Sequence, residues 1–322
     1  MLNAVIVGTG DYTYEALTAW QQLPAGINLI ETPGVAVGAR DRLYALTRNP
    51  AHPVMVFEPD GTFVASFGQG VFGERTHGIL AGPDASIYCA DDGTHTITKF
   101  SPDGQLLMTL GQRNQPAPRW SGQPFNRPTH VAVSPVSGSL YVSDGYGNSR
   151  IHKYTADGRY LSSWGEPGID PGQFIRPHNI AVDDQDRVYV ADRECHRVQV
   201  FDADGTFLTM WNNIHRPDGM TIGPDGNVYI GELNGIPGVD DAPGLGHRVS
   251  ILDRTGKLLA RFGEPIEGEG PGQFIAPHGI AVDSRGDIYV GEVSYTIRGR
   301  NMDPPRELRS LSKLRRTSPL QR

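Results

Sequence analysis

The chain has 322 residues, and its 36 acidic and 29 basic side chains give a formal net charge of −7. This acidic balance excludes a global positive field that would attract phosphate backbones, so nucleic acid is not an expected partner. The 40 glycines and 25 prolines are typical of many short strands joined by tight turns.

The N-terminus lacks a basic segment followed by a long apolar one. No later run approaches the ~18 apolar residues of a membrane-spanning helix. Two cysteines, Cys89 and Cys195, are too few for a disulfide framework and fit a reduced compartment. We therefore expect a cytoplasmic protein without a membrane partner.

In chain order, one sequence pattern recurs six times. Each copy has an apolar run, a turn, a strand of the type Val/Ile-Tyr-Val, and further strands bounded by Asp-Gly turns. The copies start near Gly34, His77, Pro128, Pro177, Pro217 and Pro277. About four strands in each repeat of ~40–50 residues is the signature of a β-propeller blade.

We therefore predict an all-β fold, a six-bladed β-propeller that forms a single domain over residues 1–322. Segment 12–20 precedes the first copy and is predicted to supply the outer strand of the last blade, which closes the ring. Longer inserts are candidates for a lid on one face, and they lie at residues 112–127, 164–176, 234–247 and 265–276.

Three histidines open the first apolar run of every second copy. His77, His178 and His278 lie about 100 residues apart. On alternate blades of a closed ring, equivalent positions are related by about 120°, so these side chains can converge. Three imidazoles form a zinc site whose fourth position is open to water or substrate.

A histidine in a turn more often serves as a hydrogen-bonded loop residue. This second interpretation applies to His95, His130, His152, His196, His215 and His247. Carboxylates that follow the Val/Ile-Tyr-Val strands are predicted to be hydrogen-bond partners that stabilise the blades. Tyr146, Arg48 and Arg193 near that position are different, because a phenol and two guanidinium groups can handle a proton and a carboxylate.

The stretch from Phe125 to Phe201 carries the motifs FNRPTHVAV, YVSDGYGNSRI, PGQFIRPHNIAV and VYVADRECHRVQVF. These motifs resemble NHL repeats, and over nearly the whole chain their order is similar to the peptidyl-α-hydroxyglycine α-amidating lyases. The resemblance implies that His77, His178 and His278 bind zinc, or another divalent metal. It also implies that Tyr146, Arg48 and Arg193 are catalytic.

Two departures from that family stand out. Its structural calcium uses backbone carbonyls that match Val35 and Ile79, plus an aspartate directly after the third zinc histidine. In this chain that residue is Gly279, which argues against calcium. Gly147 replaces a cysteine of the secreted members, so the chain resembles a bacterial-type, intracellular relative.

The resemblance implies a zinc-dependent lyase that cleaves the C–N bond of an α-hydroxy amide (a carbinolamide), giving an amide and an α-oxo acid such as glyoxylate. The expected substrate is a small or peptide-like carbinolamide with a carboxylate, made by a separate hydroxylating enzyme. A metal-dependent hydrolase of a lactone, ester or amide stays open as an alternative, because a zinc site can make hydroxide. A non-catalytic binding scaffold is a further alternative that stays open.

Overall fold

The computed structural model describes residues 4–17 and 19–320. By its internal contacts the chain divides into two compact units. Unit 1 comprises the residues up to Asn49, Met55–Ala65 and those from Asp218 onward. Unit 2 comprises Pro50–Val54 and Ser66–Pro217. The prediction of a single domain over residues 1–322 stays a prediction, and residues 1–3, Thr18 and 321–322 lie outside the described part.

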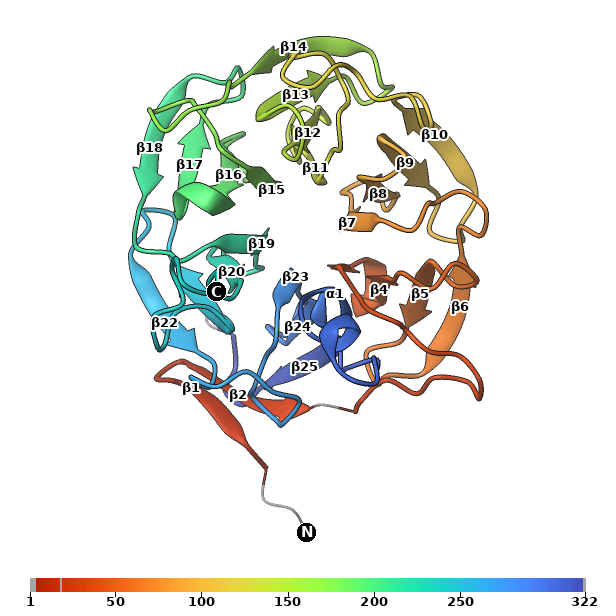
Figure 1. Cartoon of the computed structure of the whole chain (residues 1–322), viewed down its shortest axis with the longest axis vertical. Coiled ribbons are helices and arrows are strands. Elements are labelled where there is room, and N and C mark those ends of the chain that lie inside the picture. The colour runs from red at the N-terminus through yellow and green to blue at the C-terminus, as the bar shows by residue number, and fades with distance from the viewer. Residues whose placement is uncertain (1–3, 18, 321–322) are drawn as a thin grey trace. The chain divides into compact units, whose positions relative to one another are not determined.

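Unit 2 contains three four-stranded sheets, with strand orders β10-β9-β8-β7, β11-β12-β13-β14 and β15-β16-β17-β18 (Figure 1). The strands are β7 Thr76–Ala81, β8 Ile87–Asp91, β9 Thr96–Phe100, β10 Leu106–Leu110, β11 His130–Val133, β12 Leu140–Asp144, β13 Arg150–Tyr154, β14 Tyr160–Trp164, β15 Pro177–Val182, β16 Val188–Asp192, β17 Arg197–Phe201 and β18 Phe207–Trp211. A short 3-10 helix, η2 (Arg193–Cys195), follows β16. The first strand β11 contacts the first strands β7 and β15 of the two neighbouring sheets.

Unit 1 holds the other three sheets, with orders β19-β20-β21-β22, β3-β4-β5-β6 and β1-β2-β25-β24-β23. The strands are β1 Ile6–Thr9, β2 Tyr12–Leu17, β3 Gly34–Val37, β4 Leu43–Leu46, β5 Val54–Phe57, β6 Phe63–Phe67, β19 Pro217–Ile222, β20 Val228–Glu232, β21 Arg248–Leu252, β22 Leu258–Phe262, β23 Pro277–Val282, β24 Ile288–Glu292 and β25 Leu311–Arg316. The helical segments are η1 Ala39–Asp41, α1 Ser294–Ile297 and η3 Gly299–Asn301. A few end residues of β5, β6 and β19 are counted with unit 2.

The N-terminal segment belongs to the last sheet. β2 pairs with β25 in antiparallel register, with Tyr14 opposite Arg316. β1 adds a fifth strand by pairing with β2, which the sequence analysis did not anticipate. Trp20 lies beyond β2, and its ring packs edge-on against Tyr289 at 5.4 Å between centroids.

The Val/Ile-Tyr-Val strands form the buried layer of each sheet because both of their faces are covered. β8, β12, β16, β20 and β24 are buried at every residue. Their tyrosine rings are buried, and the hydroxyl of Tyr229 donates to Asp225 at 2.8 Å. The fourth strands are more exposed, although Trp164 of β14 packs its ring against Phe201 of the next sheet at 5.9 Å between centroids.

Among the described residues, the six sheets of one repeated pattern form a six-bladed β-propeller, which confirms the predicted fold class. Within this part of the chain, no helix is long and apolar enough to cross a membrane.

Candidate functional site

The three histidine-bearing strands share a local irregularity. The pairing of β7 with β8 shifts register between Thr76 and Gly78, so His77 is the extra residue of a β-bulge. The same shift occurs around His178 in β15 and around His278 in β23. A bulge bends its strand and re-aims the side chain of the unpaired residue. The chain therefore places each histidine in the same unusual backbone setting.

In unit 2 the structure brings His77, His178 and Tyr146 together. The hydroxyl oxygen of Tyr146 lies 3.0 Å from Nε2 of His77 and 3.1 Å from Nε2 of His178. The two imidazole centroids are 4.7 Å apart. Both histidines are buried. Tyr146 lies in the turn after β12, and its backbone N–H donates to the carbonyl of Arg127 at 3.4 Å.

A hydrogen bond to the other ring nitrogen orients the imidazole of His77. Nδ1 of His77 lies 2.7 Å from the carbonyl oxygen of Thr129. Because a carbonyl oxygen can only accept a hydrogen bond, Nδ1 must be the donor. The proton is thus on Nδ1, and the Nε2 lone pair is available as a ligand.

Arginine side chains surround the Tyr146 ring. The guanidinium carbons of Arg127, Arg176 and Arg193 lie 4.7, 5.1 and 5.7 Å from its centroid. Arg193 is buried in η2, and its Nε donates to Glu194 at 2.9 Å. The structure therefore places the predicted Arg193 beside Tyr146. Arg127 and Arg176 were missed, although the sequence carries a signal, because both occupy the same position of their repeats.

Two pKa shifts reflect this positive charge. Burial and then the neighbouring Arg193 lower the pKa of Arg176. Burial opposes ionisation of Glu194, but Arg193, Arg216 and Arg176 outweigh it and lower the pKa of that carboxyl to about 2. Glu194 is therefore a carboxylate at neutral pH, and it holds the guanidinium groups in place.

Unit 1 carries the other two predicted site residues. Nδ1 of His278 lies 2.6 Å from the carbonyl oxygen of Pro33, which repeats the arrangement of His77 and Thr129. Arg48 forms an ion pair with Glu31 and donates to the Thr296 hydroxyl at 2.7 Å. Arg48 is thus held by the segment before β3 and by helix α1.

His77, His178 and His278 form one of two groups of described residues that could hold a metal ion, and all three are buried. The other group is His196, His215 and Asp240. The first group fits such a role on its donor chemistry. The observed Nδ1 contacts of His77 and His278 leave Nε2 as the ligand atom, which is how metal-binding histidines are usually oriented.

The predicted calcium ligands Val35 and Ile79 lie on β3 and β7. The neighbouring Gly279 leaves no room for the aspartate that the resembled family places there. A Cβ atom on Gly279 would lie 2.8 Å from Cα of Gly34 and 2.9 Å from the backbone nitrogen of Val35. These are backbone atoms that cannot turn aside.

The carboxylates that end the buried strands hold the loops, as predicted. Asp192 accepts the backbone N–H groups of Ile175 and Arg176 at 3.1 and 3.0 Å. Glu292 accepts those of Ile275 and Ala276 at 2.6 and 3.0 Å. Both carboxylates therefore hold the segments that precede the first strands of their sheets.

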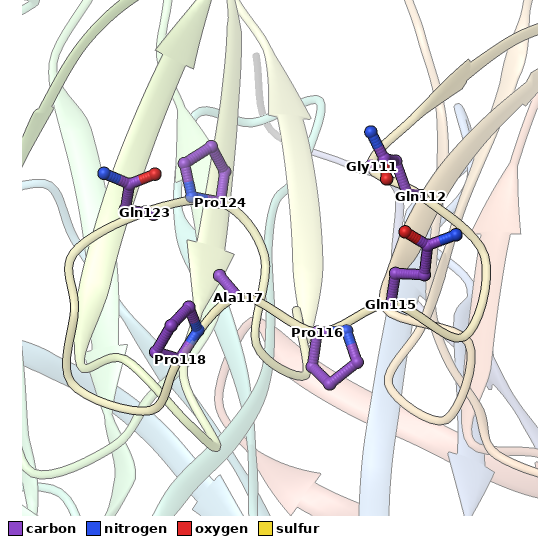
Figure 2. Close-up of a pocket in the computed structure, with 8 residues that line it drawn as sticks. All are labelled: Gly111, Gln112, Gln115, Pro116, Ala117, Pro118, Gln123 and Pro124. Atoms are coloured by element: carbon purple, nitrogen blue, oxygen red, sulfur yellow. The ribbon is translucent and has the colours of Figure 1, made fainter.

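The insert after β10 encloses a pocket of about 530 Å³. Figure 2 shows its lining of Gly111, Gln112, Gln115, Pro116, Ala117, Pro118, Gln123 and Pro124. None of these side chains is titratable, so the pocket has no group for acid–base chemistry. The lid role of the insert stays a prediction.

The fold and the site together define an NHL-repeat β-propeller with a histidine–tyrosine–arginine cluster. Residues 125–154 and 174–201 match the NHL repeat family. The chain belongs to the NHL-repeat family that includes the peptidyl-α-hydroxyglycine α-amidating lyases and NHL repeat-containing protein 3.

Several relatives support this assignment. NHL repeat-containing protein 3 of Homo sapiens is 33% identical over 256 residues, which cover 74% of this chain and 70% of the relative. Peptidyl-alpha-hydroxyglycine alpha-amidating lyase 1 of Drosophila melanogaster is 32% identical, covering 68% of this chain and 42% of the relative. Peptidyl-glycine alpha-amidating monooxygenase B of Xenopus laevis is 32% identical over 74% of this chain, but the match spans only 27% of that relative.

Solved structures share the fold at low sequence identity. A streptogramin B lyase has a TM-score of 0.61 at 14% identity, covering 96% of this chain and 97% of the other. A gluconolactonase from Xanthomonas campestris has a TM-score of 0.57 at 15% identity, covering 94% and 89%. At such identity these likenesses show the fold alone.

Proposed function

We propose that the chain is a zinc-dependent lyase that cleaves the C–N bond of an α-hydroxy amide and releases an amide and an α-oxo acid such as glyoxylate. The observation that carries the proposal is the Tyr146 hydroxyl, within 3.1 Å of Nε2 of both His77 and His178. Relatives named peptidyl-alpha-hydroxyglycine alpha-amidating lyase match 68% and 47% of this chain at 32% identity.

In this proposal His278 supplies the third metal ligand. It has the same repeat position as His77 and His178, the same bulge, and an Nδ1 contact to a backbone carbonyl. His77, His178 and His278 would hold the zinc ion, which would supply a Lewis acid that makes the substrate hydroxyl more acidic.

Tyr146 is the proton acceptor of the proposal. As a phenolate, its oxygen would remove the proton from the substrate hydroxyl, and the electron pair would form the new carbonyl as the C–N bond breaks. The resulting phenol would return this proton to the nitrogen, which leaves as the amide. No water enters the products, so atoms and charge balance without a further reactant.

Arg193 and Arg48 are the proposed carboxylate-binding residues. Guanidinium groups bind carboxylates through two parallel N–H donors, which would orient the substrate. Arg193 lies beside the Tyr146 ring. Its pairing with Glu194 fixes the side chain and so reduces the entropy lost on binding. The substrate itself requires prior hydroxylation at the α-carbon by a separate enzyme.

The test is turnover of N-benzoyl-α-hydroxyglycine by zinc-loaded protein. The proposal expects benzamide and glyoxylate in equal amounts, with no oxygen-18 incorporated from labelled water into a carboxylate. Labelled benzoate would instead identify a hydrolase. Full activity in a thoroughly metal-stripped sample would contradict the zinc dependence, and no turnover by the zinc-loaded protein would favour the binding scaffold.

A further inference from the structure

Arginine occupies one repeat position in four successive copies. Arg75, Arg127, Arg176 and Arg216 each stand two residues before the position that carries His77, Thr129, His178 or Asp218. The remaining two copies have Thr32 and Ala276 there. All four arginines belong to unit 2, as does Arg193. We call these five residues the arginine cluster.

Two carboxylates pair with the arginine cluster. Asp92 pairs with two arginines. Its Oδ1 lies 2.6 Å from Nε of Arg75, and its Oδ2 lies 2.9 Å from Nη2 of Arg127. Glu194 is shared by three guanidinium groups, at 3.2 Å from Arg176, 2.9 Å from Arg193 and 3.0 Å from Arg216.

The neighbouring carboxylate of Asp91 is engaged by the backbone. It accepts the N–H groups of Gly73, Gly93 and Thr94 at 2.6, 2.9 and 3.0 Å. Asp91 keeps its charge, but five guanidinium groups near the three carboxylates of Asp92, Glu194 and Asp91 still leave excess positive charge at this place. Like charges held this close repel one another, and an anionic ligand relieves that repulsion.

The excess charge is accessible beside the site. The side chains of Arg75, Arg127 and Arg176 are 47%, 37% and 35% exposed, whereas Arg193 and Arg216 are 7% and 8% exposed. The Nε atom of Arg176 is buried without a hydrogen-bond partner. The two buried arginines thus hold Glu194, and Arg127 and Arg176 present donors next to Tyr146. Arg75 lies beside them through Asp92, which it shares with Arg127.

We propose that the arginine cluster binds a second anionic group on the acyl part of the substrate, a carboxylate remote from the bond that breaks. The inference rests on the proposed function, because it names the substrate class of the same site. The single carboxylate at the α-carbon can occupy one or two guanidinium groups. It leaves the others for an anion further along the substrate. Arg75 donates from Nε and Nη2 to Asp92, so its remaining N–H groups would serve that anion.

The test compares two substrates of equal length, N-glutaryl-α-hydroxyglycine and N-pentanoyl-α-hydroxyglycine. We expect kcat/KM for the glutaryl compound to be at least about tenfold higher at low ionic strength. The advantage shrinks as sodium chloride is raised, because salt screens partly exposed charges. Equal kcat/KM for the two compounds overturns the inference while leaving the lyase proposal intact.

Variants of Arg75 test whether this residue causes the preference for the glutaryl substrate. Arg75→Gln lowers the preference for the glutaryl substrate several-fold, and Arg75→Lys, which keeps the charge, retains most of it. Arg159→Gln removes an exposed arginine from the turn after β13, outside the arginine cluster, and serves as the matched control. A preference unchanged in Arg75→Gln, in protein with unaltered circular dichroism, contradicts the assignment.

A binding measurement distinguishes the anion-site proposal from the lyase proposal. Calorimetry with the unreactive N-glutarylglycine and N-pentanoylglycine measures the same preference without turnover. If neither substrate reacts but the glutaryl analogue binds more tightly, the lyase proposal fails and the anion site stands. If both analogues bind equally, the anion site fails whatever the activity.

Discussion

The hydroxyl oxygen of Tyr146 lies 3.1 Å from Nε2 of His178, which stands 32 residues further along the chain. The two residues come from neighbouring sheets of unit 2, since Tyr146 follows β12 and His178 lies in β15. This contact joins a group that can accept a proton to a nitrogen that can bind a metal. It is the basis of the first prediction.

Replacing Tyr146 by phenylalanine removes the hydroxyl and keeps the ring that the arginines contact. We expect kcat for carbinolamide cleavage to fall by about 10²–10⁴-fold, the usual contribution of a positioned acid–base group. Zinc content and melting temperature should stay near those of the native protein. Tyr160→Phe, which changes an exposed tyrosine on β14, is the control. Undiminished kcat in Tyr146→Phe would exclude the tyrosine as proton acceptor.

Replacing His278 by alanine tests the three-histidine metal site. We expect about one zinc per chain in the native protein and a zinc affinity at least about tenfold weaker in the variant, because a ligand atom is lost. Elemental analysis after dialysis against a chelator measures this. His52→Ala is the control, since His52 bonds to the Ser66 hydroxyl at 2.7 Å. Equal zinc retention by His278→Ala and the native protein would rule His278 out as a ligand.

Glu194 should stabilise the fold in a pH-dependent way. Burial disfavours its charge, but the arginines around it hold the pKa of this carboxyl at about 2, below the value in the unfolded chain. The stability that the Glu194 charge adds to the fold is therefore fully present above the ordinary glutamate pKa, and it is lost as the pH falls towards 2. Glu194→Gln should lower the free energy of unfolding by about 3 kcal/mol at pH 7.

Urea denaturation at pH 7 and at pH 2.5 measures this difference. The difference in the free energy of unfolding between native protein and Glu194→Gln should be smaller at pH 2.5 than at pH 7. Glu264→Gln, at an exposed position, should differ little from the native protein at either pH. A gap of equal size at both pH values would show that hydrogen bonding, and not charge, sets the contribution of Glu194.

Gly279 should tolerate no side chain. A Cβ there would lie 2.8 Å from Cα of Gly34, so Gly279→Ala or Gly279→Asp should lower the free energy of unfolding by about 2 kcal/mol or more. Gly73→Ala is the control, because its Cβ would meet side-chain atoms and no backbone, the Thr94 methyl group at 3.1 Å and Asp91 Oδ2 at 3.5 Å. A Gly279→Asp protein that matches the native stability and binds calcium in equilibrium dialysis would contradict this prediction.

The repeated pattern was enough to predict the blades. Alternating apolar residues and Asp-Gly turns are local signals, so the strands, the six sheets and the equivalent positions of His77, His178 and His278 followed from the sequence. Tyr146 and Arg193 were also selected, partly through the resemblance to the amidating lyases. Their catalytic roles stay predictions.

Other features depend on contacts between copies, which no local pattern encodes. The bulges at the three histidines, the fifth strand β1, and the backbone approach to Gly279 arise only when neighbouring strands pack against one another. The sharing of Asp92 and Glu194 among five arginines is of the same kind. By itself the sequence determined the repeats and the residues they carry. The tertiary structure decided which charges meet, because electrostatic interactions depend on distance in space and not on separation along the chain.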